Sequence, residues 1–507
     1  MKLATCIFLV LSAGCSGKDD TAVVTDADTD TDTDTDTDPD TDTDTDTDTD
    51  TDTDTDTDTD TDTDTEVTGD WGIIEGVSCT EQKDNALRYD CEVTTSEDAE
   101  VVLSYWEAGG EADAPTFTSA SGTSHAITAW GFKQETDYTL SLVANGGDGE
   151  WSRSITTSSH GIARTNFSVA KTGKYDSKFT LLNIGCDGFE KAMIVDEDGE
   201  IRWFQDTSAY GVKLTAIEYT EQHTVLLVID DHTIAEYALD GTEIRLWDHD
   251  FTGAYPHHEV FRVNDDIWAL TGELFVDPFT GHEYVIDGVR VWNDAGVEIQ
   301  YWDTTFVDDP LMHPWSFEPG YWGDIYPNSM DLTHANAVYR DALGNLLLSL
   351  KHYHEVWLVW GDPASPDYGK LVWNLRGDGT GPMSIITDVG GPAEFSNQHH
   401  SHITPDGTLM IFDNAGTYPA RGLEMFVDPG TNTARIVGSF DTGLSCDVTG
   451  SSFRMGDHHT LVTCGPEHIV TEFDAAAVPV WTLDAACTGE GGDSPVYRSI
   501  PLVTLFP

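Results

Sequence analysis

Residues 193–203 read Met-Ile-Val-Asp-Glu-Asp-Gly-Glu-Ile-Arg-Trp: an apolar strand, an acidic turn with a glycine, and a second strand that ends in tryptophan. Similar segments, several of which also contain tryptophan or phenylalanine, recur at residues 234–244, 289–296, 356–373, 423–427 and 470–474. Six such units, each of about 40 to 65 residues, are typical of a six-bladed β-propeller. Since no window has the spacing of an amphipathic helix, the sequence predicts an all-β protein.

A smaller β-domain is expected before these repeats. Four segments alternate apolar with polar residues and are separated by Gly, Asp and Ser: Tyr89 to Val93, Glu100 to Trp106, His125 to Thr128 and Tyr138 to Ala144. This pattern favours a small β-sandwich over residues 70–160. Because residues 135–138 resemble the corner of fibronectin-type modules, we expect a fibronectin/Ig-like accessory domain in front of a propeller that spans residues 161–507.

The first residues have the features of an export signal. Lys2 precedes an apolar run from Leu3 to Leu11, which is too short to span a bilayer, and small residues then lead to Cys15. This resembles bacterial lipoproteins, whose new N-terminal cysteine is acylated after cleavage, although Leu11 stands one place further from the cysteine than usual. We therefore expect residues 1–14 to be a signal peptide and Cys15 to anchor the protein to a membrane at the bacterial cell envelope, in the periplasm or at the cell surface. An ordinary signal peptide with an incidental cysteine is the alternative.

Residues 15–69 are dominated by an alternation of Thr and Asp. Such a segment has too few apolar residues for a core and its charges repel one another, so we interpret it as a disordered linker. Calcium binding is the alternative, but the glycine of a calcium-binding loop is missing from the repeat. The whole chain has 24 Lys and Arg against 91 Asp and Glu, a net charge of −67, which argues against nucleic acid as a partner.

Six cysteines follow Cys15, an even number that suits disulfides in an oxidising compartment. Cys79 and Cys91 are the expected pair. The other four allow three connectivities, between which the sequence does not choose: Cys186, Cys446, Cys464 and Cys487.

The histidines follow the repeat. Several of the 18 stand where the innermost strand of a blade would face a central channel: His257-His258, His334, His399-His400 with His402, and His458-His459. Neutral imidazole is a nucleophile near pH 7 and also transfers protons. Histidines gathered in a channel therefore favour a catalytic site.

Three phrases resemble the bacterial arylsulfotransferase family. They are Thr333 to Val338, continuing through Gly344 to Ser349 and Lys351; Phe395 to His399, followed by Asp406-Gly407 and Ile411 to Asn414; and His257 to Val260. Weaker matches are Gly369 to Trp373 and Tyr497-Arg498. Members of this family are six-bladed propellers that move a sulfuryl group between phenols without the nucleotide sulfate donor PAPS.

The resemblance implies a role for each matching residue. His399 would attack sulfur and become a sulfohistidine, with His334 and His258 as the other catalytic histidines. The residues that would bind substrate are Asn336, Lys351 and Arg498. Phenols and aryl sulfates are the implied partners, with no cofactor and no metal, so the resemblance predicts an aryl-sulfate sulfotransferase.

Other interpretations stay open. Lys351 stands where well-studied members have an arginine, and lysine lacks the bidentate fork, so His352 is an alternative anion contact. The ordinary structural roles are a turn cap for Asn336, the closing of a blade turn for Asp413-Asn414, and an ion pair with surface acids for Arg498. For His257, His400, His458 and His459 a buried structural histidine is the favoured interpretation. The two competing functions are a binding propeller without catalysis and a metallohydrolase whose ligands would be His258, His399, His400 and His402.

Overall fold

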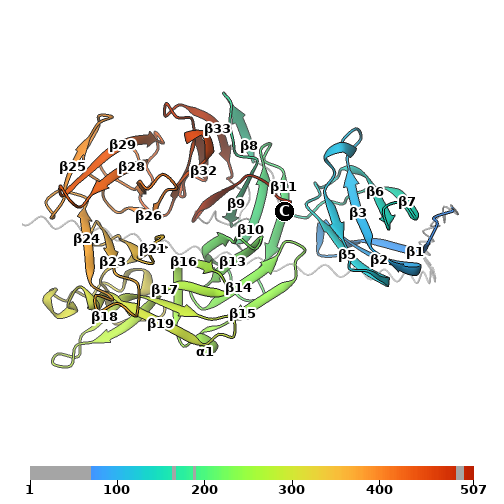
Figure 1. Ribbon diagram of the computed structural model, residues 1–507. Helices are drawn as coiled ribbons and strands as arrows, with labels where there is room; N and C mark the ends of the chain where they lie inside the picture. Colours follow the sequence, from blue (N-terminus) through green and yellow to red (C-terminus); the bar gives the residue numbers. More distant parts are fainter. Residues whose placement is uncertain (1–69, 163–166, 186–189, 487–495, 507) are drawn as a thin grey trace, which may run out of the picture. The chain divides into compact units, whose positions relative to one another are not determined.

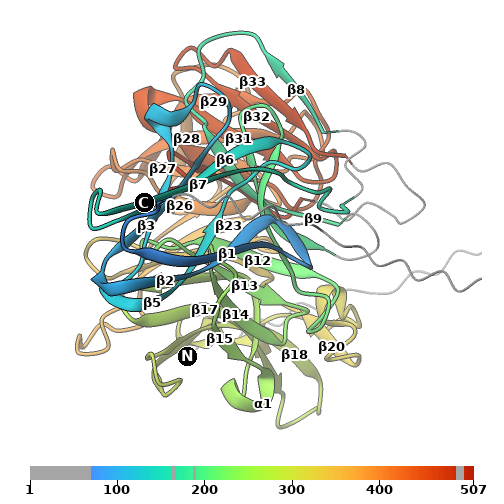
Figure 2. The ribbon, with the colours of Figure 1, turned by 90° about the vertical axis from the view of Figure 1, so that its right-hand side faces the viewer.

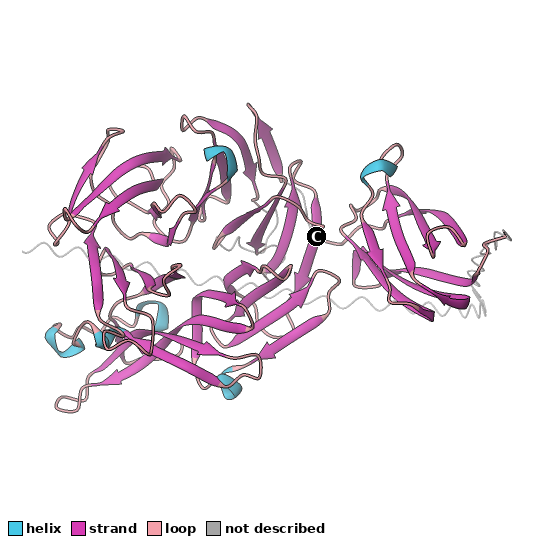
Figure 3. Ribbon diagram, in the orientation of Figure 1, coloured by secondary structure: helices cyan, strands magenta, loops and turns pink. Residues whose placement is uncertain are grey.

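The computed structural model describes residues 70–162, 167–185, 190–486 and 496–506 of the 507. Strands dominate these segments (Figure 3), which confirms the predicted all-β class. The helices of the described part are α1 (His249–Thr252) and the 3-10 helices η1 (Glu111–Asp113), η2 (Thr304–Phe306), η3 (Pro310–Met312), η4 (Gly320–Trp322) and η5 (Gly456–His458). Within the described residues, no helix has the length and apolar character needed to cross a membrane.

Two antiparallel sheets form the N-terminal region (Figure 2). Their orders are β1-β2-β5 and β4-β3-β6-β7, with the bounds β1 (Ile74–Gln82), β2 (Asn85–Ala99), β3 (Val101–Trp106), β4 (Thr116–Thr118), β5 (Gly122–Trp130), β6 (Asp137–Ala144) and β7 (Gly149–Thr156). The four predicted segments fall on β2, β3, β5 and β6. In β2, for example, Tyr89, Cys91 and Val93 are buried while Asp90 and Glu92 are exposed. The sequence missed β1, β4 and β7 because few of their side chains are buried.

Two disulfides lie in the described part of the chain. Cys79 bonds Cys91, its direct partner in the β1–β2 register, which confirms the expected pair. Cys446 bonds Cys464. Cys15, Cys186 and Cys487 lie outside the described residues.

Six further sheets, numbered here sheet 1 to sheet 6, follow in the described residues from 168 onward (Figure 1). Sheets 1 to 3 are β9 (Phe179–Ile184), β10 (Lys191–Asp196), β11 (Ile201–Asp206) with β34 (Ser499–Leu502); β12 (Leu214–Tyr219), β13 (Thr224–Ile229), β14 (Thr233–Ala238), β15 (Glu243–Trp247); and β16 (Tyr255–Val263), β17 (Asp266–Val276), β18 (Glu283–Trp292), β19 (Glu298–Asp303) with β20 (Ser329–Asp331). Sheets 4 to 6 are β21 (Ala335–Arg340), β22 (Leu346–Leu350), β23 (Glu355–Val359), β24 (Leu371–Arg376); β25 (Ser384–Thr387), β26 (His399–Ile403), β27 (Leu409–Asp413), β28 (Arg421–Asp428), β29 (Thr433–Asp441); and β30 (Ser451–Arg454), β31 (Thr460–Cys464), β32 (Ile469–Phe473), β33 (Pro479–Asp484) with β8 (Ser168–Lys171).

Each predicted repeat segment lies in a different sheet. The six segments fall on β10, β14, β18, β23, β28 and β32. Strands far apart in the chain complete the first and last sheets: β34 pairs with β9, and β8 pairs with β33. The sheets are arranged like the blades of a β-propeller.

Apolar side chains pack between successive sheets, and several tryptophans lie in these layers. Trp203, Trp292 and Trp481 are each only 1% exposed. The indole N–H of Trp203 donates to the Leu239 oxygen of sheet 2, and that of Trp481 donates to the Glu197 oxygen in the region of sheet 1. Such buried donors need a partner, so these bonds fix the tryptophans between the sheets.

Candidate active site

Three of the predicted histidines lie at the beginning of sheets 3, 4 and 5. His258 is in β16, His334 immediately precedes β21, and His399 opens β26. Because β16 contacts β21 and β21 contacts β26, these residues come together. His458 and His459 differ from the expectation: they follow β30 instead of standing on it, with His458 exposed and His459 bonded to Glu472.

The backbone is bent at these positions. His258, His334 and His400 have φ values of 55, 47 and 50°, in the left-handed region that residues other than glycine rarely adopt. The pairing register shifts between His257 and Val260 and between His399 and His402. A bulge redirects side chains that would otherwise alternate across the strand, and such irregularities concentrate at functional sites.

A cavity of about 380 Å³, the histidine cavity, opens among these strands. It is lined by Glu190, Lys213, Leu214, Thr215, His258, Tyr321, His334, Lys351, Val448, Thr449 and Tyr497. The rings of His258 and His334 lie 5.3 Å apart, and the ring of Tyr321 lies 4.4 Å from that of His258. The cavity therefore combines imidazoles and ammonium groups with an aromatic wall, a suitable set for an aromatic anion.

His399 is not among the described residues that line this cavity, but its partner Asn414 bonds Thr449, which does line it. The tautomer of His399 is fixed. Its Nδ1 is 2.7 Å from Oδ1 of Asn414 and 3.0 Å from the main-chain oxygen of Asn397. The Asn414 amide nitrogen donates to the oxygens of Cys446 and Thr449, both at 2.8 Å. The amide oxygen must then face the imidazole, so Nδ1 carries the hydrogen and Nε2 has the lone pair.

The ring of His399 is also kept neutral. Burial lowers its pKa to about 3, against the raising effect of the Asn414 bond and with a further contribution from the charge of Lys351. An imidazole with a low pKa and a free Nε2 is unprotonated throughout the physiological pH range. His399 thus has the electronic state of a nucleophile.

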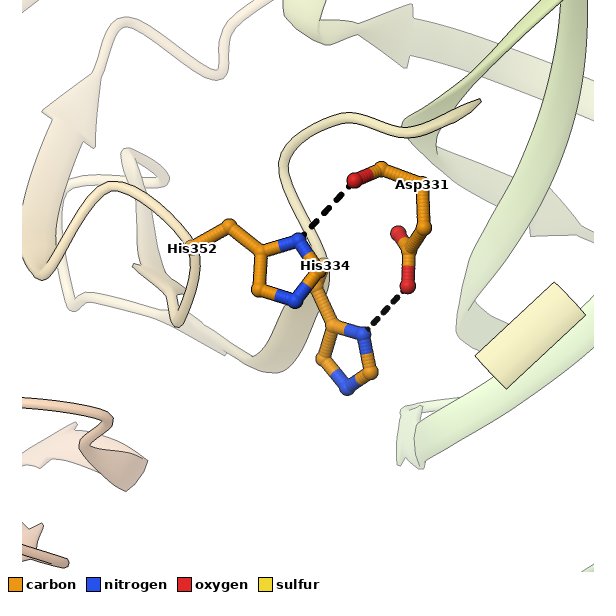
Figure 4. A group of neighbouring side chains, drawn as sticks. All are labelled: Asp331, His334 and His352. Atoms are coloured by element: carbon orange, nitrogen blue, oxygen red, sulfur yellow. Dashed lines mark hydrogen bonds and ion pairs between the residues drawn. The ribbon is translucent and has the colours of Figure 1, made fainter. Parts of the chain in front are cut away.

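His334 is paired with a carboxyl group that the sequence did not single out. Its Nδ1 lies 2.6 Å from Oδ2 of Asp331 (Figure 4). Burial raises the pKa of Asp331 to about 7, while burial and then Lys351 lower the pKa of His334. When Asp331 is protonated it donates to Nδ1, and Nε2 of His334 carries the hydrogen. When the pair loses one proton, Asp331 accepts from Nδ1–H and Nε2 becomes a base.

His258 is supported by its neighbour. Nδ1 of His257 lies 2.8 Å from Nδ1 of His258, and Nε2 of His257 lies 3.2 Å from Oδ1 of Asp287. Burial and then the charge of His257 lower the pKa of His258, which is therefore neutral. A His257 that donates to it from Nδ1 would leave His258 with its hydrogen on Nε2.

Lys351 lines the histidine cavity, where burial lowers its pKa. Lys213 and Tyr321, which the sequence did not single out, line it too, as does Tyr497, which was given no role. Tyr497 donates to the His258 oxygen at 2.6 Å, and the weak Tyr497-Arg498 match was its only signal. Lys213 and Tyr321 stand in no recognisable phrase, so nothing in the sequence pointed to them.

Asn336 and Arg498 do not appear among the described residues that line this cavity. Asn336 is buried and donates to the oxygen of Gln398 at 2.8 Å, so it ties the strand after His334 to the residue before His399 and caps no turn. Arg498 is 2% exposed and forms a two-pronged bond to buried Glu259, at 2.5 and 2.8 Å, instead of pairing with a surface acid.

The four residues of the metallohydrolase alternative do not form a ligand set. His400 bonds the Ser452 oxygen through Nδ1, and it lines a different cavity together with His402. Among the described residues, the clusters with metal-binding geometry contain none of His258, His399, His400 and His402.

Comparison with known proteins adds the following. Residues 317–486 match the model of the arylsulfotransferase (ASST) family. No curated protein matches the chain. Among solved structures, a protein of unknown function from Bacteroides caccae is 12% identical, with 64% of this chain aligned to 99% of that one and a TM-score of 0.39. A streptogramin B lyase is 10% identical, with 64% of this chain aligned to 90% of that one and a TM-score of 0.37. A virginiamycin B lyase from Staphylococcus aureus is 9% identical, with 62% of this chain aligned to 87% of that one and a TM-score of 0.34.

Likenesses to structures at this distance say nothing about activity or substrate. The family match is the informative one, because the matched residues contain His334, Lys351 and His399 together with their partners Asp331 and Asn414. The phrases around His334 and His399 that carried the resemblance lie within the residues that match the arylsulfotransferase model.

Proposed function

We propose that this protein is an aryl-sulfate sulfotransferase that works without PAPS, through a sulfohistidine at His399. The observation that carries the proposal is the Asn414 bond, which leaves Nε2 of a neutral His399 unprotonated. Asn414 also bonds Thr449 of the histidine cavity, which is lined by two more histidines and two lysines. A nucleophile of this kind needs an adjacent acid for its leaving group and cations for its anionic substrate.

In the first half-reaction, Nε2 of His399 attacks the sulfur of an aryl sulfate. The N–S bond forms, the S–O(aryl) bond breaks, and the phenolate leaves with the electron pair. Nε2–H of His334 protonates the phenolate while the proton of Asp331 moves to Nδ1, or His258 donates from Nε2 while the hydrogen on Nδ1 of His257 moves to Nδ1 of His258. Lys351 and Lys213 stabilise the charge on the sulfuryl oxygens.

In the second half-reaction an acceptor phenol takes the place of the first product. Its proton returns to Nε2 of His334, Nδ1–H returns to Asp331, and its oxygen attacks sulfur as the N–S bond breaks. His399 recovers its lone pair. A carboxyl group whose pKa is about 7 suits this exchange, since it gives and takes a proton with little driving force either way.

The test is intact-protein mass spectrometry after incubation with 4-nitrophenyl sulfate at mildly alkaline pH. We expect an added mass of about 80 Da, one sulfuryl group, that disappears when a phenol is added. The adduct should be absent from His399→Ala and present in His402→Gln, a matched control on the same strand that lines the other cavity. No adduct and no nitrophenolate with several aryl sulfates would favour the binding propeller, for which the lysine at 351 is the supporting observation.

We also propose that sheets 1 to 6 are the blades of a six-bladed propeller. The contacts between β12 and β16, β16 and β21, β21 and β26, β26 and β30, and β30 and β34 support a ring of inner strands. For the N-terminal sheets we propose an Ig-like fold of the fibronectin type, over residues 70–160. Its support is the strand order and the Tyr138 hydroxyl, which accepts from the amide of Lys133 as in a tyrosine corner.

For the N-terminal residues we propose a signal peptide over 1–14, a lipid on Cys15 and a linker over 15–69, which would hold the enzyme at the cell envelope. Metabolic labelling with a fatty acid tests this. The wild-type protein should be labelled and sediment with membranes, whereas Cys15→Ala should be unlabelled. Label on both proteins would contradict acylation at Cys15.

A further inference from the structure

Asp331, His334 and His352 form a compact group of three side chains, drawn in Figure 4. We propose that this group is a binding site for a divalent transition metal of the zinc class. One carboxylate and two imidazoles are a donor set that such ions favour. One potential ligand atom from each residue lies within 4.8 Å of the others, so small side-chain movements would bring all three to a common ion.

His352 is already oriented as a ligand. Its Nδ1 lies 2.9 Å from the main-chain oxygen of Asp331, to which it donates, so Nε2 has the lone pair. Histidines that bind metals ordinarily donate their other ring nitrogen to a carbonyl or carboxylate in this way. This bond therefore fixes both the tautomer and the ring orientation that a metal site needs.

One carboxyl oxygen of Asp331 forms no hydrogen bond. The residue is only 4% exposed, and its Oδ2 contacts His334, while its buried Oδ1 has no hydrogen-bond partner. A buried carboxylate oxygen without a partner is unfavourable, and a cation would satisfy it.

A second group, Asp176, His459 and Glu472, has one histidine and two carboxylates and serves as a comparison. Glu472 contacts His459 and also accepts the amides of Asp176 and Ser177, at 2.6 and 2.9 Å, so both of its oxygens are occupied. The contrast singles out the group at Asp331.

Access comes from a separate cavity of about 1040 Å³, the outer cavity, which Asp331 and His352 line. It leaves room for water or a small anion at the remaining coordination position. Buried Asp287, which accepts the amide of Ala335 at 2.7 Å, adds a carboxyl group close to His334, while Lys351 opposes the cation from the histidine cavity. The metal would thus enter through a different cavity from the one proposed for the sulfate.

Metal binding would act on the proposed transfer reaction, a consequence that rests on the proposed function. An ion on Nδ1 of His334 replaces its hydrogen bond to Asp331. The proton shared by that pair is then lost, and His334 can no longer alternate between acid and base. We expect occupancy of the site to inhibit sulfuryl transfer.

The experiment uses the full chain, freed of metal with a chelator and titrated with Co²⁺ while visible absorption is recorded. We expect one equivalent to give the intense bands of a low-coordinate nitrogen-containing site. The many aspartates of residues 25–65 provide only oxygen ligands, whose cobalt complexes absorb weakly. In His352→Gln the Co²⁺ dissociation constant should rise at least ~100-fold.

His313→Gln is the matched control, since His313 lines the same cavity but pairs with Asp308. An unchanged spectrum in His352→Gln, loss of the spectrum in His313→Gln, or no intense band in the wild type would each overturn the proposal. Because absorption is read without any sulfate ester, these outcomes are separate from failure of the sulfotransferase. Zn²⁺ should also inhibit nitrophenolate release in the wild type and not in His352→Gln.

Discussion

The two cavities that share the inner strands differ in chemistry. The histidine cavity and a second one of about 600 Å³, here called the arginine cavity, are lined by adjacent residues of one strand or segment: His258 faces the first and Glu259 the second. Tyr497 and Arg498 divide in the same way. Because successive side chains along an extended segment point in opposite directions, His258 and Tyr497 line one cavity and Glu259 and Arg498 line the other.

The two cavities differ in the balance of the charged side chains that line them. In the arginine cavity the guanidinium of Arg498 is already paired with Glu259, and that of Arg262 is paired with Glu236. Arg340 shares the lining with three further acids, Glu218, Glu221 and Asp341. In the histidine cavity Lys213 and Lys351 face a single acid, Glu190, which accepts the Leu214 amide. In a chain of net charge −67 an anion needs local cations, so the histidine cavity is the better place for a sulfate ester.

The largest effect on the histidine cavity is expected from a substitution that no longer fixes the tautomer of His399. Asn414→Ala removes the acceptor for Nδ1–H, so the hydrogen can move to Nε2 and block attack. We expect kcat to fall by about 10³- to 10⁴-fold, as for other catalytic histidines held in the wrong tautomer. Stopped-flow release of nitrophenolate measures this, and circular dichroism checks the fold. Activity within about tenfold of the wild type would mean that the bond to Asn414 does not prepare the nucleophile.

In the arginine cavity we expect a substitution to reduce the stability of the protein and not its activity. Arg498→Met leaves Glu259 as an unpaired buried carboxylate, which should lower the free energy of unfolding by about 3–5 kcal/mol. Denaturant unfolding measures it. Activity of the folded fraction should stay within about threefold, because Arg498 does not line the histidine cavity. A large rise in KM with little loss of stability would show instead that Arg498 binds substrate, as the family resemblance implies.

Lys351→Arg tests how the cation at position 351 of the histidine cavity binds the sulfuryl group. A guanidinium could bind two sulfuryl oxygens at once where the ammonium binds as a point charge. We expect kcat/KM for 4-nitrophenyl sulfate to rise by about three- to tenfold, about 0.7–1.4 kcal/mol. Lys213→Arg is the control at the other lysine. A fall in kcat/KM for Lys351→Arg would indicate that the cavity is shaped around lysine.

The repeat and the catalytic phrases were readable in the sequence because they are local. The six repeat segments each mark one sheet, and the phrases around His334 and His399 lie within the residues that match the family model. Residues that the fold brings to the histidine cavity from other parts of the chain could not be predicted from the sequence. Tyr321 reaches the cavity from a long insertion between β19 and β21, and Lys213 precedes an unremarkable strand.

Side-chain pairing was the other limit. Asn414 was in a recognised phrase, yet its role depends on contacts to residues 446 and 449, which no local pattern reveals. The resemblance likewise placed Arg498 with the substrate, whereas the structure pairs it with Glu259.

The smallest expected effect is a pH dependence of stability at Glu218 in the arginine cavity. Burial and then Glu259 raise the pKa of Glu218 from 4.5 to about 8, so the folded state binds a proton that the unfolded state has lost between these values. Stability from this group is complete below pH 4.5 and is lost as the pH rises through 8. Glu218→Gln should therefore match the wild type at pH 4 and melt about 1–3 °C higher at pH 9. Thermal melts across this range measure it, with exposed Glu221→Gln as control. If the melting temperature of Glu218→Gln instead rose relative to the wild type toward low pH, Glu218 would be ionised in the folded protein. The two cavities would then differ less in charge than the ion pairs indicate.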